Sequence, residues 1–579
     1  MKHNRFVIKI GGASGQGINS VGEIMAKGLK RTGFNVFAYR EYPSLIQGGF
    51  ATYQLDFSDR DINASSMNWD LAICLSRDAI HNLITNLNKN GILIHSIETT
   101  VLSRKEKELI EEKDLKIIKI EAKEVIKEMG GIKILENIFL LNIAWRLLDL
   151  NNKVIKQIIK ERFIDKKKVL RMNLKCIEEA QNYNLPQGIN KFKINFSQDE
   201  SNKSNLLITG NYAMALGAIA AGVRAYYAYP MTPSSSILTY LAKVAEKTGM
   251  LVKQAEDEIT AVQMTLGSMH MGTRALVATS GGGFDLMSES FSMAGMAEIP
   301  LVCIVAQRPG PATGLPTWTA GGDLNMAVYA GHGEYPRCVY AASDAGSAYL
   351  VVQKALNTAE KFQIPVIVLT EKQIAESFYL LNNLPESLEI ERGLVVGKEI
   401  ENIESKDRYK ITDTGISPRW LPGQTPNTFY ANADEHFEQG RITEDKDESK
   451  KIYKKRMKKL QTLKKELPEP EVFGKEQGDI LFVGWGSVKA TVLDVMNLQN
   501  QKNISYLHYE CLYPVKTEKF QNIKDNFNKI VLIENNYSGQ LGDLIKLGCG
   551  HNFENKLLKY DGRPFFIEEI LDYIESIND

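Results

Sequence analysis

A carboxylate that could do chemistry stands at the start of a predicted buried helix. The segment QAEDEITAVQ (254–263) places three acids between an apolar strand and a run of small and apolar residues. Glu256 and Asp257 suit an N-terminal cap, because carboxylates accept hydrogen bonds from the free N–H groups of a helix start. Glu258 opens the apolar run, where a carboxylate is costly unless it has a partner. A capping role and a bond to a ligand with a protonatable nitrogen both remain open for Glu258.

Two further loops carry groups that could bind an acid. AYYAYPMTPSSS (225–236) ends an apolar strand in a run of hydroxyls framed by prolines, and Thr232 lies between the two prolines. A turn followed by a helix N-cap is the ordinary interpretation of such a run. VAQRPGPATGLPT (305–317) ends a strand with Arg308, whose guanidinium suits a bidentate grip on a carboxylate or phosphate. A loop-closing role for Arg308, through backbone carbonyls, is equally open.

Three glycine-rich turns follow predicted strands, in segments 10–19, 280–290 and 484–487. A glycine turn that opens a helix exposes backbone N–H groups at the positive end of the helix dipole, which suits a phosphate. A tight turn explains each signal nearly as well. The glycines that we single out are Gly12, Gly15, Gly17, Gly281 and Gly282.

Several α/β domains must position these residues, because 579 residues exceed what one core holds. Short apolar runs alternate with helical patterns, which predicts doubly wound, parallel sheets. Strand ends in such sheets share one edge, so one site can draw on several of the loops. We expect an α/β domain at 1–193, a polar linker at 194–205, a second α/β domain at 206–380, an irregular connecting region with a charged, solvated helix at 381–475, and a small α/β domain at 476–579.

Composition excludes some classes of protein. Seventy basic residues balance seventy acidic ones, which argues against a nucleic-acid binder that works through bulk charge. The six cysteines form no CxxC pair, so neither a zinc ribbon, an iron–sulfur site nor a disulfide framework is expected on this chain. No apolar stretch reaches 18 residues, and the N-terminal stretch lacks a signal-peptide core. We expect a reduced, cytoplasmic protein that does not bind a membrane.

The order of the motifs resembles that of a known enzyme family. YPMTPSSS, QAEDEITAVQMTLGSMHMG, ATSGGGFDLMSES, QRPGPATGLPT and AGHGEYPR follow one another at close spacing. Together they resemble the α subunit of the 2-oxoacid:ferredoxin oxidoreductases. GGASGQGINSVGEIMAKGL resembles the family's γ domain, here fused at the N-terminus, and ENNYSGQLGDLI and KYDGRPF resemble its C-terminal domain. The resemblance implies a γ domain at 1–193, a thiamine-diphosphate pyrimidine-binding domain at 206–380 and a transketolase C-terminal-like domain at 476–579.

The resemblance also implies an activity that needs a second subunit. With a β subunit, the family uses thiamine diphosphate to decarboxylate a 2-oxoacid oxidatively. The products are CO₂ and an acyl-CoA made from coenzyme A, and the electrons go to ferredoxin. Mg²⁺ and a [4Fe–4S] cluster are expected on the partner, since this chain has no convincing GDG-type metal motif and no cluster cysteines; GGDLN (321–325) is a poor candidate. The family further implies an (αβ)₂ assembly.

By the same resemblance, individual residues acquire roles. Glu258 aligns with the glutamate that bonds the pyrimidine ring of the cofactor, and Thr232 and Arg308 align with residues at the substrate's carboxylate or keto oxygen. The turn of Gly281 and Gly282 is expected beside the cofactor. The γ-domain loop, with Gly12, Gly15 and Gly17, could assist in holding coenzyme A.

Some positions depart from the family's pattern. Ser280–Gly283 replaces a common SGPG, and the Trp318–Gly321 loop lacks a common basic or polar residue followed by Glu-Gln. Ser14 replaces a common glycine, and Gln47 a common arginine, so a coenzyme A role for the γ domain is open. His332 and Asp323 are expected to be structural residues; they lie near the 318–321 loop.

Alternatives follow from these departures. A non-catalytic scaffold or regulatory relative is the main one. An enzyme acting on aryl pyruvates is another, although such α chains usually carry ferredoxin-like cysteine motifs that are missing here. Pyruvate, 2-oxoglutarate and branched-chain 2-oxoacids all remain candidates as substrate, with a slight preference for 2-oxoglutarate or a broad range.

Overall fold

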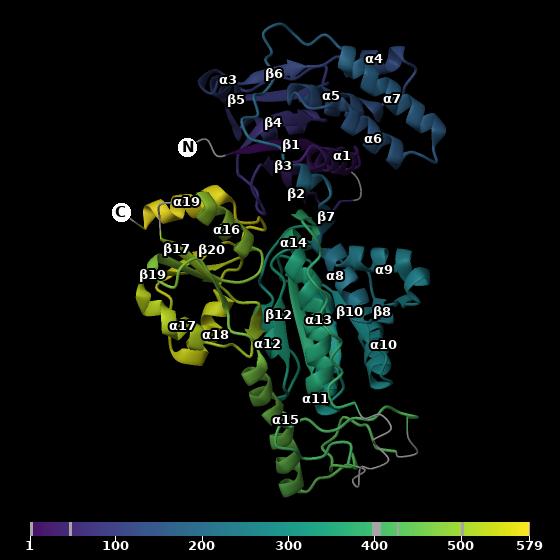
Figure 1. Ribbon diagram of the computed structural model, residues 1–579, viewed down its shortest axis with the longest axis vertical. Coiled ribbons are helices and arrows are strands. Elements are labelled where there is room, and N and C mark those ends of the chain that lie inside the picture. Colours follow the sequence, from purple (N-terminus) through teal and green to yellow (C-terminus); the bar gives the residue numbers. More distant parts are fainter. Residues whose placement is uncertain (1–3, 46–48, 396–406, 425–427, 499–502, 578–579) are drawn as a thin grey trace. The chain divides into compact units, whose positions relative to one another are not determined.

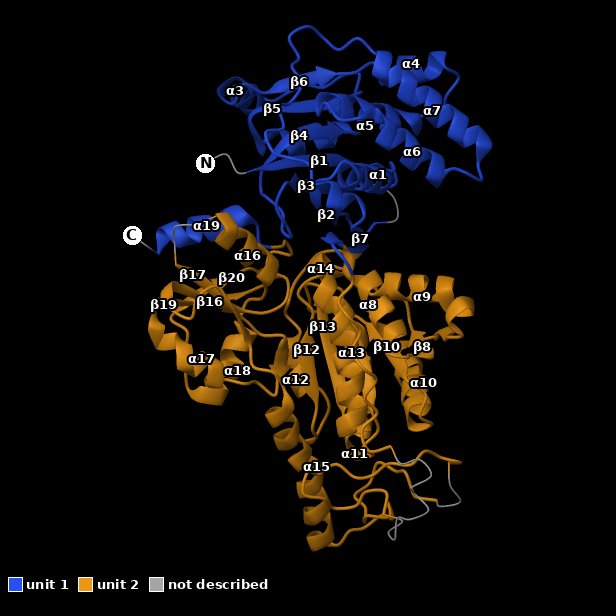
Figure 2. Cartoon of the chain, viewed as in Figure 1, with its two compact units in different colours: residues 1–208, 377–383, 565–579 blue, residues 209–376, 384–564 orange. Residues whose placement is uncertain are grey.

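The computed structural model describes residues 4–45, 49–395, 407–424, 428–498 and 503–577 (Figure 1). The chain divides into two compact units, one made of residues 1–208, 377–383 and 565–579, the other of residues 209–376 and 384–564 (Figure 2). Each unit has its own sheets and core. None of the helices found in the described residues is long and apolar enough to cross a membrane.

The first unit contains one eight-stranded sheet. Its strands, in spatial order, are β6 (Lys116–Lys119), β5 (Leu87–His95), β4 (Trp69–Cys74), β1 (Arg5–Ala13), β3 (Phe50–Ser58), β2 (Asn35–Glu41), β14 (Phe378–Leu381) and β7 (Leu206–Thr209). Strand β1 is parallel to β4 but antiparallel to β3, which is in turn antiparallel to β2. The prediction of a purely parallel sheet is therefore wrong for this half. The segment between β2 and β3 is too short for a crossover helix, so these two strands must run antiparallel.

Helices cover this sheet. They are α1 (Ile18–Arg31), α2 (Arg77–Ile84), α3 (Arg104–Glu112), α4 (Ala122–Glu128), α5 (Leu135–Leu147), α6 (Asn152–Arg162) and α7 (Lys167–Asn182), and the unit also includes α19 (Ile567–Ser576). Helix α5 is buried nearly all round, which explains its uninterrupted run of apolar residues. Strands β7 and β14 and helix α19 come from outside residues 1–193, so distant stretches of sequence complete this unit.

The second unit contains a seven-stranded sheet that carries the candidate site. Its strands, in spatial order, are β18 (Cys511–Tyr513), β12 (Cys338–Ala341), β13 (Pro365–Glu371), β11 (Leu301–Gln307), β10 (Ala275–Thr279), β8 (Ala225–Ala228) and β9 (Leu251–Gln254). All are parallel except β18, which pairs antiparallel with β12. Every residue of β11 is buried, as expected for a parallel strand covered on both faces. The helices associated with this sheet are α8 (Gly210–Ala220), α9 (Ser235–Thr248), α10 (Glu258–His270), α11 (Gly281–Met296), α12 (Leu324–Tyr329), α13 (Ala345–Phe362) and α14 (Lys372–Glu376).

A third, five-stranded sheet belongs to the same unit. Its order is β15 (Glu471–Phe473), β17 (Ile504–His508), β16 (Gly478–Gly484), β19 (Phe527–Glu534) and β20 (Asn555–Leu558), with helices α16 (Val488–Leu498), α17 (Glu518–Ile523) and α18 (Gln540–Cys549). Apolar residues of both sheets, such as Val305, Leu369 and Trp485, lie in one core cluster. The small C-terminal sheet is thus packed firmly against the sheet that carries the site.

The connecting region contains one long helix, α15 (Lys446–Glu466), as its charge pattern predicted. The expectation that its charges are solvated is wrong for two lysines. Lys455 and Lys459 are fully buried, and both bind Glu298 at the end of α11, at 2.6 and 2.5 Å. A buried carboxylate just after α11 thus pairs with two lysines of the charge run and makes their positions buried ones.

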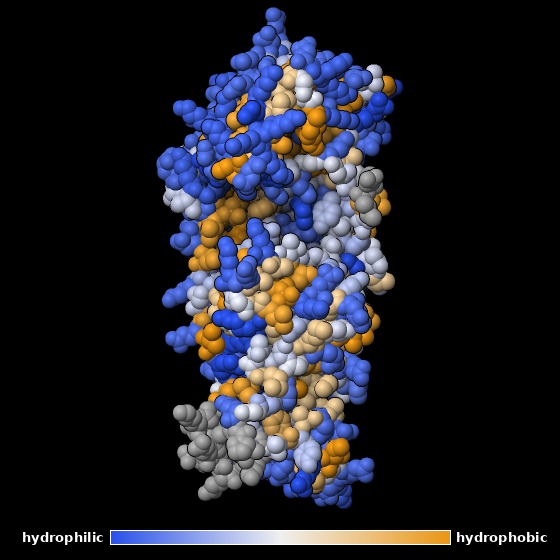
Figure 3. Space-filling model, turned by 90° about the vertical axis from the view of Figure 1, so that its right-hand side faces the viewer, coloured by the Kyte–Doolittle hydropathy of each residue, from blue (hydrophilic) through white to orange (hydrophobic). Residues whose placement is uncertain are grey.

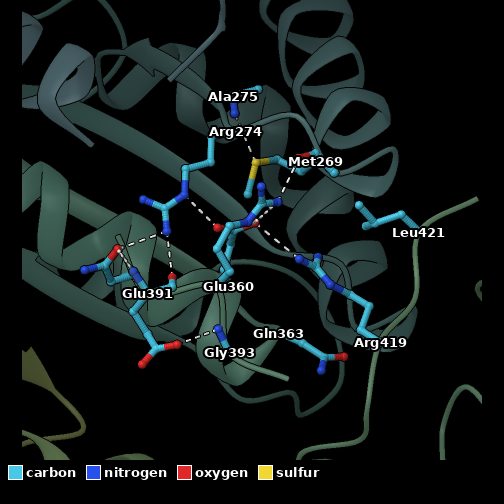
Figure 4. A network of polar contacts seen from close by, with 12 residues as sticks. Met269, Arg274, Ala275, Glu360, Gln363, Glu391, Gly393, Arg419 and Leu421 are labelled. Carbon is cyan, nitrogen blue, oxygen red and sulfur yellow. Dashed lines mark hydrogen bonds and ion pairs between the residues drawn. The ribbon is translucent and has the colours of Figure 1, made fainter. Parts of the chain in front are cut away.

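A second buried ion network holds this region to α13. Arg274 and Arg419 point at Glu360 in Figure 4, at 2.6 and 3.2 Å, and Arg392 lies 2.7 Å from the same carboxylate. Arg274 precedes β10, whereas the other two arginines come from the irregular segment. One buried glutamate therefore joins three parts of the chain.

Candidate functional site

The predicted site residues follow strands that lie side by side. Strand β10 pairs in parallel with β8 on one side and β11 on the other. Thr232 follows β8, the turn of Gly281 follows β10, and Arg308 follows β11. Carboxyl ends of neighbouring parallel strands meet at one edge, so the fold gathers these residues as the sequence predicts.

Glu258 is buried, and one of its carboxylate oxygens has no hydrogen-bond partner among the residues that the structure describes. It is the first residue of α10 and only 4% exposed, and its Oε1 atom accepts no hydrogen bond from the described residues. The cap is supplied by Asp257, whose side chain accepts from the backbone N–H of Thr260 at 2.7 Å. The capping role is therefore filled by Asp257. An orphaned, buried acceptor fits a ligand that presents a protonated nitrogen.

The glycines at the start of α11 make room for polar groups. A Cβ atom built on Gly283 would lie 2.7 Å from Glu258 Oε1 and would also clash with the Thr279 hydroxyl. At Gly282, where relatives often have proline, the surroundings are open, with the nearest atom, the Ala312 carbonyl oxygen, 3.9 Å away. Ser280 is the N-cap residue, but its buried hydroxyl caps nothing and has no partner in the described part of the chain. This turn consequently places unbonded polar groups beside Glu258.

Arg308 and Thr232 are in direct contact. The Arg308 Nη1 atom donates to the Thr232 carbonyl oxygen at 2.9 Å, so the loop-closing role considered for the arginine is present. Burial lowers the pKa of Arg308, and the nearby Asp323 carboxylate opposes this effect. The arginine therefore remains a cation beside the hydroxyl-rich loop.

Two of the serines in the hydroxyl-rich loop serve local structure. The Ser234 hydroxyl donates to the Met231 carbonyl, and the Ser236 hydroxyl accepts from Asn211, both at 2.7 Å. Thr232 is half-buried and lies beside Arg308. Of these hydroxyl-bearing residues, Thr232 has the surroundings that best suit contact with a bound molecule.

Residues of the C-terminal sheet clamp the loop that follows Arg308. The Gly321 N–H donates to the Asn535 carbonyl at 2.7 Å, and the Gly322 carbonyl accepts from Gln540 at 2.8 Å. In the same loop, Trp318 is stacked against the Arg563 guanidinium, which lies 3.4 Å from the centroid of the tryptophan ring. Sequence reasoning recognised the motifs that hold these residues but missed their clamping role, because nothing in their spacing reveals which loop they bind.

His332 lies outside this site. It is exposed and lines a separate cavity of about 370 Å³ whose walls include Met293, Tyr335 and Arg456. None of the residues that line this cavity is Glu258, Thr232 or Arg308. Across the described residues, no group of three or more histidine, cysteine, aspartate or glutamate side chains is arranged to hold a metal ion.

The glycine loop of the first unit forms a helix start that is open to an anion. Gly15 and Gly17 adopt left-handed backbone conformations, with φ of 89° and 82°, which other residues adopt only with strain. Gly17 is the N-cap of α1, whose first turn has no side-chain cap and no acid. A Cβ on Gly12 would lie 2.7 Å from the Gln16 side-chain oxygen, which itself accepts from the Ala13 N–H. Ser14 donates its N–H to the Gly49 carbonyl, while Gln47 lies outside the described residues.

Apolar side chains are exposed next to Glu258. Ile259 on α10 and Leu286 on α11 are 48% and 52% exposed. Figure 3 shows patches of apolar side chains among polar ones on the side of the molecule where α9 and α10 lie in Figure 1. Exposed apolar side chains that border a half-open site suit a protein partner.

Comparisons with known proteins agree with the resemblance seen in the sequence. Residues 216–458 match the family described as "Pyruvate flavodoxin/ferredoxin oxidoreductase, thiamine diP-bdg", and residues 7–183 match "Pyruvate ferredoxin/flavodoxin oxidoreductase". A 2-oxoacid:ferredoxin oxidoreductase subunit alpha from Sulfolobus sp is 31% identical, covering 97% of this chain and 95% of that one. The 2-oxoglutarate synthase subunit KorA of Archaeoglobus fulgidus is 29% identical over 64% of this chain and 98% of its own length.

A solved structure shares the whole fold. The 2-oxoglutarate:ferredoxin oxidoreductase from Magnetococcus marinus, with 2-oxoglutarate, coenzyme A and succinyl-CoA bound, matches with a TM-score of 0.90 and 26% identity. The match covers 99% of this chain and 100% of that chain. The alternation of strands and helices, the shared edge with Glu258 and the near full-length relatives lead to one conclusion: this chain belongs to the α subunits of the 2-oxoacid:ferredoxin oxidoreductases.

Proposed function

We propose that this chain is the catalytic α subunit, with the γ domain fused at its N-terminus, of a 2-oxoacid:ferredoxin oxidoreductase. Together with a β subunit it decarboxylates a 2-oxoacid oxidatively to CO₂ and an acyl-CoA and passes the electrons to ferredoxin. The observation that carries the proposal is the buried, partnerless carboxylate oxygen of Glu258 beside a glycine turn.

Glu258 holds a proton at the cofactor. Thiamine diphosphate, when bound, supplies the electron sink that the decarboxylation needs. Glu258 Oε1 is free to bond the ring nitrogen of the aminopyrimidine and to exchange a proton with it. Burial of this carboxylate limits the access of water to it, and Gly283 leaves the space that its oxygen occupies; Gly281 and Gly282 precede it in the turn expected beside the cofactor.

Arg308 and Thr232 orient the substrate. The guanidinium is a cation suited to the carboxylate of a 2-oxoacid, and its bond to the Thr232 backbone carbonyl fixes the arginine side chain beside the loop that carries Thr232. Oriented binding of this kind lowers the entropic cost of reaction. Residues 206–380 act in this proposal as the pyrimidine-binding domain and residues 476–579 as a transketolase C-terminal-like support, joined by the connecting region 381–475.

The β subunit completes the site. Mg²⁺, the diphosphate-binding residues and a [4Fe–4S] cluster belong to this partner in our proposal. The exposed Ile259 and Leu286, next to Glu258, provide apolar area for its docking. We infer an (αβ)₂ assembly.

The γ domain, residues 1–193, assists in binding coenzyme A. The linker, residues 194–205, follows it. The uncapped start of α1, with Gly12, Gly15 and Gly17 before it, offers N–H groups to a phosphate. For the substrate we favour 2-oxoglutarate or a broad range of 2-oxoacids, supported by relatives named 2-oxoglutarate synthase and 2-oxoacid:ferredoxin oxidoreductase.

Reconstitution tests the proposal. The chain is co-purified with its β subunit and supplied with thiamine diphosphate, Mg²⁺ and coenzyme A. Pyruvate, 2-oxoglutarate and a branched-chain 2-oxoacid are then offered separately. We expect dye reduction that depends on a 2-oxoacid and on both subunits.

A variant identifies the residue responsible. Glu258→Gln keeps the shape of the side chain but cannot exchange the proton, so the rate should fall about 10²- to 10⁴-fold. Glu256→Gln is the matched control and should retain activity. A complex that reduces dye with none of the 2-oxoacids would instead favour the scaffold or regulatory alternative.

A further inference from the structure

Asp323 stands at a capping position but does not cap. It is the N-cap residue of α12, and its side chain makes no hydrogen bond to that helix. An aspartate in this position ordinarily accepts a hydrogen bond from the helix backbone, which stabilises the helix start. The Oδ2 atom is instead buried without a hydrogen-bond partner in the described residues. The side chain therefore does not serve as a helix cap.

The Asp323 carboxylate faces the turn beside Glu258. A Cβ atom built on Gly281 would lie 2.8 Å from Asp323 Oδ2, just as one on Gly283 would lie 2.7 Å from Glu258 Oε1. Two glycines of one helical turn thus each leave room for a carboxylate from elsewhere in the chain. Two carboxylate oxygens that have no hydrogen-bond partner among the described residues thus approach the turn that follows β10.

The position of Asp323 is fixed from two directions. Its backbone N–H donates to the side chain of Gln307, the buried last residue of β11, at 2.9 Å. The clamp from the C-terminal sheet holds the next residues on both sides, since Gln540 donates to the Gly322 carbonyl and accepts from the Asn325 N–H. The carboxylate is consequently placed by the fold rather than by a mobile loop.

Two charged groups act on this carboxylate, Arg308 and Asp285, while Glu258 contacts another glycine of the same turn. Arg308 follows β11, Asp285 lies on α11, and Glu258 begins α10 on the far side of the glycine turn. Burial raises the pKa of Asp323 from 3.8 to about 6, Asp285 acts in the same direction, and Arg308 opposes both. Asp323 is also the residue that stabilises the charge of Arg308.

A substrate carboxylate at Arg308 would bring a new negative charge close to Asp323. Two carboxylates that share a site cannot both remain ionised without cost, so one of them takes up a proton. The substrate carboxylate pairs with the arginine, whereas the Asp323 Oδ2 atom is already buried and the pKa of this carboxyl is already raised to about 6. Protonation of Asp323 therefore costs less free energy than protonation of the substrate carboxylate.

We propose that Asp323 controls the charge of the 2-oxoacid site by taking up one proton from solvent when the substrate carboxylate binds beside Arg308. The proton joins a carboxylate oxygen of Asp323 and no bond of the substrate changes. After CO₂ has left, Asp323 returns the proton to solvent. This inference rests on the proposed function and adds a positioning residue that acts through Arg308.

Calorimetry measures the proton directly. The α·β complex, freed of thiamine diphosphate, is titrated with pyruvate and, separately, with 2-oxoglutarate at pH 7.5 in two buffers of different ionisation enthalpy. We expect about one proton to be taken up per substrate bound. Asp323→Asn cannot take up this proton, so its binding heat should not depend on the buffer. Equal proton uptake in the wild type and the variant would overturn the inference.

Steady-state kinetics of the complete enzyme supply a second readout. In the wild type, KM for the 2-oxoacid should rise about tenfold per pH unit above the midpoint of Asp323, whereas kcat should change less. In Asp323→Asn, KM should be nearly independent of pH between about 6 and 8. A variant KM with the wild-type pH profile would contradict the inference and leave the proposed function intact, whereas absence of turnover in the wild type would contradict both.

A second variant tests the inference even if Asp323→Asn does not fold. Asp285→Asn, on the exposed side of α11, removes one cause of the raised pKa. It should move the midpoint of the KM profile to lower pH and keep its slope. If Asp323→Asn does not fold, as judged by its melting temperature and binding of β, an unmoved midpoint in Asp285→Asn or an absence of proton uptake in the wild type would overturn the inference.

Discussion

At the scale of single residues, the site depends on space as much as on functional groups. Glu258 and Asp323 each carry an oxygen that is buried without a partner, and in each case the space is created by a missing side chain at the start of α11. Gly283 could be recognised from the sequence only as part of a turn. Its role as the neighbour of Glu258 required the packing of α10 against α11.

Gly283→Ala tests this dependence on space. The added methyl group would clash with Glu258 Oε1 and the Thr279 hydroxyl, so it should displace the carboxylate and destabilise the protein by about 1–3 kcal/mol. We expect a large loss of 2-oxoacid-dependent dye reduction and a lower melting temperature.

Gly282→Ala is the matched control, one residue away in the same turn. Its surroundings are open, and alanine is the better helix former, so stability should be unchanged or slightly higher. Full activity in Gly283→Ala, or equal losses in the two variants, would show that the glycine turn does not shape the site.

At the scale of elements, the charged helix α15 shows why a charge pattern alone misleads. Its sequence has lysines on every side, and most of them are exposed, as predicted. Lys455 and Lys459 are buried because a single carboxylate, Glu298, lies under the helix. These two lysines hold the pKa of Glu298 well below its ordinary 4.5, despite the burial that opposes this shift.

Glu298→Gln should loosen α15. The amide keeps the shape of the side chain but leaves two buried ammonium groups without a counter-charge, which costs about 3–5 kcal/mol. We expect a lower midpoint of urea unfolding, followed by tryptophan fluorescence, and faster proteolysis of the 384–466 region.

Glu448→Gln provides the control on the same helix. Glu448 pairs with Lys451 at the surface, so its loss should cost about 1 kcal/mol or less. The sign of the pH effect follows from the lowered pKa of Glu298. Its contribution is complete above about 4.5 and is lost only as the pH falls through the lower, folded-state value. Equal destabilisation by the two variants at pH 7 would contradict the buried role of Glu298.

At the scale of the whole chain, residues from both ends build the first unit. Glu568 on the C-terminal helix α19 bonds the Ser66 hydroxyl and accepts from the Met67 N–H at 2.8 Å. Ser66 in turn donates its N–H to Asp56, whose pKa is raised to about 7, mainly by burial. The C-terminus therefore stabilises a loop that lies some 500 residues earlier in the sequence.

Glu568→Gln should expose this long-range link. The amide cannot accept both hydrogen bonds as a carboxylate does, so hydrogen exchange at Met67 and its neighbours should speed up by about tenfold, for a loss near 1.4 kcal/mol. Glu575→Gln, at an exposed position of the same helix, should leave exchange in residues 60–70 unchanged. Unchanged exchange in Glu568→Gln would show that α19 does not support the loop.

The sequence by itself determined the α/β class, the alternation of strands and helices that frames the site, and the choice of Glu258, Thr232 and Arg308 as candidates. The spacing of apolar residues, the turn residues and the order of the motifs are local properties of the sequence. They can therefore be recognised without the tertiary structure. The tertiary structure decided what depends on distant neighbours: the antiparallel half of the first sheet, the burial of Lys455 and Lys459, the clamp on the loop after Arg308, and the approach of Asp323 to Gly281. Each of these is a contact between segments far apart in sequence. Burial and pairing belong to both partners of a contact, so neither partner's own pattern reveals them.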